Sequence, residues 1–376
     1  MPSVVNIKEN ELQSKTIDWL RFPLVVLVLF GHINPLVDMQ SANLSLYDIF
    51  GTLISKTLGH LTISCFFMFS GYLFFVQVKE WSRTVYFTKM KKRLRTLLLP
   101  YVLFNVLAIS VQILKMILKD DGTLYPFLND LSENWYRILW NYKWVEGYTV
   151  NMLGQPLQMC FTPYLIPLWF MRELMVMVVI SPIVYYLVKY TKVFGVVVLG
   201  LCYYTNIWIE IPGYSAQFFL TAFFFFSLGA FFSVNGKNMV VSLRKYQIVW
   251  FVISLITMFL SVYFYGTDYK AYFLPIFILS GVISVINITS YFMERGKLRV
   301  SKTLSKATFF IYLTHDISIL YYTTLVFNKI IGTDSTMQLL AIYFVTPFVC
   351  AGVILCIYVA MQRFFPKLLG LCVGNR

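Results

Sequence analysis

The stretch TIDWLRFPLVVLVLFGHINP, residues 16–35, decides the fold class of this chain. It is mostly apolar, and a helix of about 20 apolar residues spans the hydrocarbon core of a bilayer. Arg21 and His32 nevertheless lie inside it, eleven positions apart. Eleven residues of α-helix make three turns plus about 20°, so both side chains point from one stripe, about 16 Å apart along the axis. Ionisable groups inside a membrane helix are costly, which predicts a function for this pair.

The rest of the chain has the composition of a protein that crosses a membrane several times. Of its 376 residues, 59% are hydrophobic and 13% are charged, whereas soluble domains carry about 25% charged residues. Apolar runs of about 20 residues each predict spans near 17–36, 55–78, 96–118, 163–188, 193–210, 214–234, 246–266, 271–292, 307–327 and 337–361. We therefore expect an all-α, polytopic integral membrane protein with about ten transmembrane helices.

The basic residues indicate how these spans are oriented. The net charge is +14, and most Lys and Arg residues form short clusters between apolar runs. This is the pattern of the positive-inside rule, with both termini in the cytoplasm, and it argues against a nucleic-acid partner. We expect a cytoplasmic tail over 1–15, a transmembrane domain over 16–362 and a second tail over 363–376. The outer segment 119–162 is either an interfacial aromatic belt or a lid or acceptor platform, since aromatic faces stack on sugar rings.

Each residue of the opening pair has two interpretations. Arg21 either anchors the helix by extending to the inner headgroups or binds a negative group near the inner surface. His32 either bonds to a neighbouring helix or acts as a general base, because an imidazole titrates near neutral pH. Only three histidines occur, none with the spacing of a metal site, and we expect no metal.

Two segments on the second and third spans contain candidate donor-binding residues. In CFFMFSGYLFF, residues 65–75, Ser70 and its neighbouring glycine form a small notch that serves either close helix packing or passage of a thin ligand. In KMKKRLRTLLLPYVLFN, residues 89–105, the cluster with Lys92, Arg93 and Arg95 either sets topology or binds phosphate on the cytoplasmic face.

Two later spans contain candidate pocket residues. Trp169, Arg172 and Glu173 open the fourth span. Adjacent helical positions point about 100° apart, so we expect Arg172 and Glu173 not to pair with each other. In the ninth span, His315 and Asp316 lie at a depth similar to that of His32. His315 therefore either shares a pocket with His32 or makes an interhelical hydrogen bond.

The chain resembles the membrane-bound acyltransferase 3 family in six segments, which occur in the same order along the chain as in that family. They are the Arg21–His32 pair, FMFSGYLFF, KKRLRTLLLPYVLFN, PLWFMRELMVMVVISP, FFFFSLGAFF at 223–232 and LSKATFFIYLTH at 304–315. The resemblance implies a bacterial inner-membrane enzyme. Such an enzyme transfers an acyl group, usually acetyl, from cytoplasmic acyl-coenzyme A to a hydroxyl of a cell-envelope glycan or a lipid-linked acceptor.

The resemblance also implies roles for individual residues. Arg21 and His32 become the essential pair, and Arg93 and Arg95 a donor-side element with Lys92. No tightly bound cofactor is expected, because acyl-coenzyme A is a co-substrate. His32 acts either as a general base or through an acyl-imidazole. The alternative function is a transporter or polysaccharide exporter whose buried charges line a polar path. The oligomeric state is left open.

Overall fold

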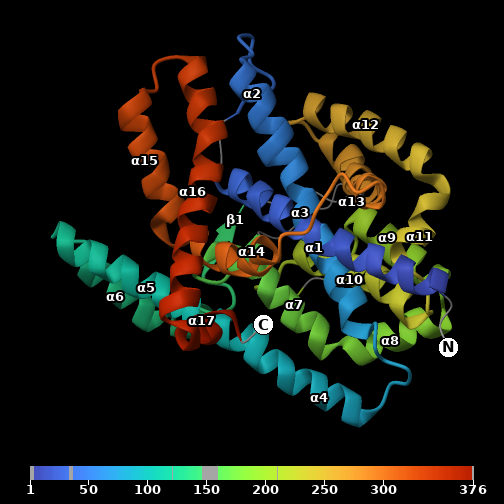
Figure 1. Ribbon diagram of the computed structural model, residues 1–376. Helices are drawn as coiled ribbons and strands as arrows, with labels where there is room; N and C mark the ends of the chain where they lie inside the picture. The colour runs from blue at the N-terminus through green and yellow to red at the C-terminus, as the bar shows by residue number, and fades with distance from the viewer. Residues whose placement is uncertain (1–3, 34–36, 121, 146–159, 210, 375–376) are drawn as a thin grey trace.

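The computed structural model describes residues 4–33, 37–120, 122–145, 160–209 and 211–374 (Figure 1). One antiparallel pair of short strands, in which Lys143 lies opposite Thr162, accompanies the helices. The predicted all-α class is confirmed. The elements are α1 (Val4–Ile33), α2 (Leu46–Gly51), α3 (Gly59–Phe75), α4 (Arg83–Arg93), α5 (Leu99–Lys119), α6 (Leu124–Glu133), β1 (Lys143–Val145), β2 (Cys160–Thr162), α7 (Trp169–Val179), α8 (Ser181–Tyr190), α9 (Val193–Thr205), α10 (Ala216–Val234), α11 (Met239–Leu243), α12 (Gln247–Tyr263), α13 (Lys270–Glu294), α14 (Lys302–Thr314), α15 (Leu320–Ile331), α16 (Thr336–Phe364) and α17 (Pro366–Val373).

Three π-helical turns and several 3-10 turns connect these helices. The π-helical turns are η1 (Thr52–Leu58), η2 (Leu94–Leu98) and η6 (His315–Ile319). η1 joins α2 to α3, and η2 joins α4 to α5, so each makes one long stretch of helix from two. η6 instead contains a break in helical geometry at Ile317 and Ser318. π-Turns are rare and often mark functional sites.

Within the described ranges, seven helical stretches are long and apolar enough to cross a membrane. The pair α7 and α8, bent by 65°, provides an eighth if counted as one span. The predicted spans 193–210 and 307–327 correspond to the 13-residue helix α9 and to the interrupted segment α14–η6–α15. A multi-pass membrane protein is thus confirmed. The number ten, the domain limits and the cytoplasmic ends stay predictions, and α1 already begins at Val4, inside the predicted tail.

The core of the bundle is formed by α1, α3, α10 and α13. Figure 1 shows α1 and α3 at the centre, with α15 and α16 on one side and α12 and α13 on the other. α3 packs along α10, and α1 contacts α3, α13 and α14. Phe67, Phe75, Phe225 and Phe226 are completely buried between α3 and α10 and their neighbours. This packing holds the end of α1 inside the protein.

Two glycines allow α3 and α10 to pack backbone against backbone. A Cβ atom on Gly71 would lie 2.0 Å from the Phe226 carbonyl oxygen, and one on Gly229 would lie 1.9 Å from the Met68 carbonyl oxygen. Small residues permit such close approach in membrane helices. The notch beside Ser70 is therefore filled by α10, which supports the packing interpretation of that motif.

We predict that Gly71→Ala lowers the stability of the bundle. The added methyl group forces α3 and α10 apart, and overpacking of this kind costs about 1–3 kcal/mol. Thermal unfolding in detergent should show a lower Tm. Gly352→Ala is the matched control, because nothing lies within 4 Å of a Cβ at that position of α16. Equal Tm values for the two variants would contradict the close packing.

Candidate active site

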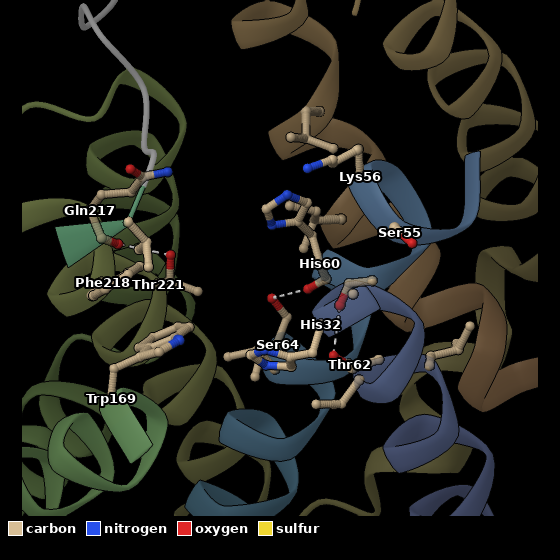
Figure 2. A pocket seen from close by; sticks show the side chains of 18 of the residues that line it. His32, Ser55, Lys56, His60, Thr62, Ser64, Trp169, Gln217, Phe218 and Thr221 are labelled. Atoms are coloured by element: carbon tan, nitrogen blue, oxygen red, sulfur yellow. Dashed lines mark hydrogen bonds between the residues drawn. The ribbon is translucent and has the colours of Figure 1, made fainter. Parts of the chain in front are cut away.

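A cavity of about 710 Å³ lies between two walls of helices. Figure 2 shows His32, Lys56, His60 and Ser64 on one wall, from α1, η1 and α3. Trp169 of α7 and Phe218 and Thr221 of α10 face them across the space. The start of α13 contributes Lys270 to the lining, and the middle of β1 contributes Trp144. The cavity is therefore assembled from segments that are far apart in the sequence.

The end of α1 places His32 in this cavity. His32 is the penultimate residue of the helix and shares the lining with Leu27, Val28 and Gly31. The last four carbonyl groups of a helix lack partners within it. The Ser55 hydroxyl donates to one of them, that of Phe30, at 2.6 Å, and also lies 2.7 Å from the Tyr343 hydroxyl. η1 and α16 thus fix the turn that carries the imidazole.

The structure brings His315 and His32 together. Their ring centroids are 4.9 Å apart, and the rings meet edge to face at 63°. His315 is fully buried behind His32, whereas the next residue, Asp316, lines the cavity. The two histidines are thus in contact, but His315 is not part of the cavity lining, so a pocket shared by both rings stays a prediction. Burial lowers the pKa of Lys143 on β1, and the nearby Asp316 carboxylate opposes that shift.

The opposite wall is flat and aromatic with a few polar groups. Trp169 stacks on Phe218 with centroids 3.9 Å apart and planes 12° apart. Gln217 and Thr221, on successive turns of α10, line the cavity beside this pair. Aromatic surface with a few placed polar groups is typical of small-molecule sites. Such a wall offers a face for a sugar ring and hydrogen bonds for its hydroxyls.

The expectation that Arg172 and Glu173 would not pair was wrong. Arg172 Nε and Nη2 donate to Glu173 Oε1 at 3.0 and 2.7 Å, because both long side chains bend back toward each other. Arg172 Nη1 also donates to the carbonyl oxygens of Trp140 and Phe161, and the Tyr214 hydroxyl bonds to Glu173. The cluster is buried, and neither charged residue lines the cavity. It ties α7 to the outer segment and to the start of α10.

The predicted cytoplasmic elements lie apart from the cavity. Arg21 is paired with Asp18 at 2.9 Å, with 35% of its side chain exposed. The cavity lining on α1 starts at Leu27, six residues beyond Arg21. Arg93 is half-buried with its guanidinium 5.7 Å from the centre of the Phe74 ring, and Lys92 and Arg95 are exposed. Ser70 is half-buried outside the lining.

Several cavity residues were missing from the sequence-based set. They include Lys56 and Ser64, each four residues from His60, and Gln217 and Thr221, which are four residues apart. A polar stripe of this spacing inside an apolar span was the available signal. The part of the outer segment at 146–159, with Glu146, lies outside the described residues, so its role as a lid stays a prediction. Among the described residues, no group of three His, Cys, Asp or Glu side chains is placed to hold a metal ion.

Comparison with known proteins identifies the family of this chain. The model of a family described as an acyltransferase domain matches residues 14–361. The chain belongs to the acyltransferase 3 family. It is also similar to the succinoglycan biosynthesis protein ExoH of Rhizobium meliloti (strain 1021), with 22% identity over 377 residues that cover 96% of this chain and 92% of that protein. No solved structure matches the chain significantly.

Membership of the acyltransferase 3 family agrees with the geometry. The predicted resemblance is confirmed over nearly the whole chain, and the protein is an acyltransferase. The family match favours the enzyme over the exporter among the functions that the sequence left open. The cavity with its cavity-facing imidazole is the candidate active site of this enzyme. The cluster of Arg172 and Glu173 is best explained as a support of one wall.

We predict that Arg172→Met destabilises the enzyme strongly. Removing one partner of a buried ion pair leaves an uncompensated charge, which costs about 3–5 kcal/mol. The double variant Arg172→Met/Glu173→Gln should recover part of the loss in Tm, because the unpaired carboxylate is removed. A well-folded Arg172→Met protein with wild-type Tm and no acyl transfer would contradict the supporting role.

Proposed function

We propose that the protein is an O-acyltransferase of the bacterial inner membrane. It transfers an acyl group, acetyl in the simplest case, from cytoplasmic acyl-coenzyme A to a hydroxyl of a cell-surface polysaccharide or its lipid-linked precursor. The observation that carries this proposal is the His32 imidazole in a large cavity at the end of a candidate membrane span, in a chain of the acyltransferase 3 family. The polysaccharide acceptor is chosen because the curated relative is named for succinoglycan biosynthesis.

The acceptor occupies the cavity in this proposal. A sugar ring packs against the stacked pair of Trp169 and Phe218, within reach of Gln217 and Thr221. His32 lies on the facing wall, so a hydroxyl of that ring approaches the imidazole from the cavity side (Figure 2). Holding both reactants in one enclosed space removes much of the entropic barrier to their reaction.

The donor reaches His32 from the opposite side. Its anionic nucleotide stays in cytoplasmic water beside Lys92, Arg93 and Arg95. The guanidinium groups of the two arginines can form bidentate hydrogen bonds with phosphate. The long arm of the donor follows α1 past Arg21 toward His32. Buried side chains of Leu24 and Val25 fill the helix face between Arg21 and the start of the cavity. Donor binding therefore requires the helices to separate along this stretch.

Proton transfer through His32 completes the reaction. The imidazole takes the hydroxyl proton as the acceptor oxygen attacks the thioester carbonyl carbon. The new carbon–oxygen bond forms, the carbon–sulfur bond breaks, and the imidazolium returns its proton to the departing thiolate of coenzyme A. In the rival route the imidazole itself is acylated first and then transfers the group.

We predict that His32→Ala lowers glycan O-acylation by about 10²- to 10⁴-fold, the usual contribution of a general base. Mass spectrometry of envelope glycans from a deletion strain that expresses each variant measures the ester content. His60→Ala, which removes an imidazole from the same cavity, should cause a smaller loss. Normal ester content with a stably inserted His32→Ala protein would overturn the assignment of the base.

Neutralising the exposed basic residue Arg95 should weaken binding of the donor. Arg95→Gln removes a phosphate contact, so we expect KM for acyl-coenzyme A to rise about tenfold, as for loss of about 1.4 kcal/mol, with kcat nearly unchanged. Initial rates in inverted membrane vesicles measure both constants. Arg299→Gln is the control, since it removes another exposed cation. A fall in kcat at constant KM would contradict the donor-side role.

A further inference from the structure

His315 has a buried nitrogen with no partner, and this nitrogen belongs to the ring that touches His32. His315 Nδ1 lies 2.8 Å from the Tyr312 carbonyl oxygen and 3.2 Å from that of Ile311. Carbonyl oxygens only accept hydrogen bonds, so Nδ1 carries the hydrogen. The other nitrogen, Nε2, is then a bare acceptor. Among the described residues it has no hydrogen-bond partner, and it is inaccessible to solvent.

A buried acceptor without a partner calls for a physical explanation. Leaving such a group unsatisfied costs about 1–3 kcal/mol, and native proteins rarely tolerate it. A doubly protonated His315 would not remove the cost, because it would bury a charge and leave Nε2–H as an unpaired donor. The ring beside His315 is His32, with centroids 4.9 Å apart. In this edge-to-face arrangement the two rings make no hydrogen bond, and they must turn toward each other for a nitrogen of each to share one hydrogen.

We propose that His315 Nε2 accepts the N–H of His32 during catalysis and so positions the base. This inference rests on the proposed function, in which His32 exchanges the proton. With one His32 nitrogen bonded to His315, the other is fixed as the acceptor that faces the cavity. The same bond stabilises the imidazolium that forms when His32 takes the proton. His315 keeps its own hydrogen on Nδ1 throughout, so it is a positioning residue.

A break in η6 follows His315, which touches His32, and Asp316, which lines the cavity. Ile317 and Ser318 leave helical geometry immediately after them, and Ser318 adopts a positive φ of 76°. A non-glycine residue in that region costs about 1–3 kcal/mol. The Lys115 ammonium donates to the Ser318 hydroxyl at 2.6 Å and holds the break in place. The turn that carries His315 and Asp316 is therefore held at its C-terminal end.

Two amide variants separate the two nitrogens of His315. In His315→Asn the side-chain NH₂ can still donate to the Tyr312 carbonyl, but it is too short to reach His32. In His315→Gln the amide oxygen can take the place of Nε2 and accept from His32. We expect ester content and kcat to fall about 100-fold or more in His315→Asn and about tenfold in His315→Gln, on the scale of general-base catalysis. KM for both substrates should change little.

The experiment uses the full-length protein in a deletion strain. Ester content is read by mass spectrometry, and initial rates are measured in vesicles with the acyl-coenzyme A that matches the ester found. Tm and membrane level are recorded for each variant. A merely structural His315 predicts the reverse order, since Asn preserves the visible hydrogen bonds. Three results would overturn the inference: a higher activity of His315→Asn than of His315→Gln, an equal fall in activity in both variants, or a change in KM with no change in kcat.

The two proposals fail in different ways. An active His32→Ala protein would end the assignment of His32 as the base, and with it the role of His315. An inactive, folded His32→Ala protein beside a fully active His315→Asn protein would remove only the positioning role. If His32→Ala is inactive and His315→Gln is more active than His315→Asn, both proposals are supported.

Discussion

The need to satisfy polar groups where there is no water governs this structure. In a bilayer an unpaired donor or acceptor costs several kcal/mol, so polar side chains in spans bond within the protein. Thr16, Thr257, Ser280 and Thr346 each donate to a carbonyl group one turn earlier in their own helix. Arg172 meets the same constraint with Glu173 and two backbone carbonyls. These side chains are polar without being free to react.

At the site this constraint is met only in part. His32 faces the cavity on one side and the His315 ring on the other, and His315 keeps one nitrogen without a protein partner. The contrast with Arg172 and Glu173 is instructive, because all four residues are ionisable groups inside apolar segments. A charge whose donors and acceptors are all used within the protein supports the fold. A ring with an unused nitrogen beside a cavity is available for substrate or for a proton.

Breaks in helical geometry position these groups. A continuous helix through 302–331 would carry the chain straight on beyond Asp316. The break at Ile317 and Ser318 redirects it instead. On the other wall the 65° bend between α7 and α8 follows Trp169, and η1 leads into the turn with His60. Close packing of α3 on α10 through Gly71 and Gly229 then fixes the two walls relative to each other.

The sequence by itself determined the class of protein, the family and three residues of the cavity lining, which are His32, Trp169 and Asp316. Hydropathy is a local property, so apolar runs predict spans directly, and the stripe shared by Arg21 and His32 follows from helical repeat alone. Only the tertiary structure decided which ionisable residues meet. Arg172 pairs with Glu173 because their long side chains bend toward each other. The rotation of about 100° between successive helical residues does not predict this, because it describes only where each side chain leaves the backbone. The tertiary structure also placed His315 against His32 and left Arg21 outside the cavity, because those relations depend on how distant helices pack and where they break.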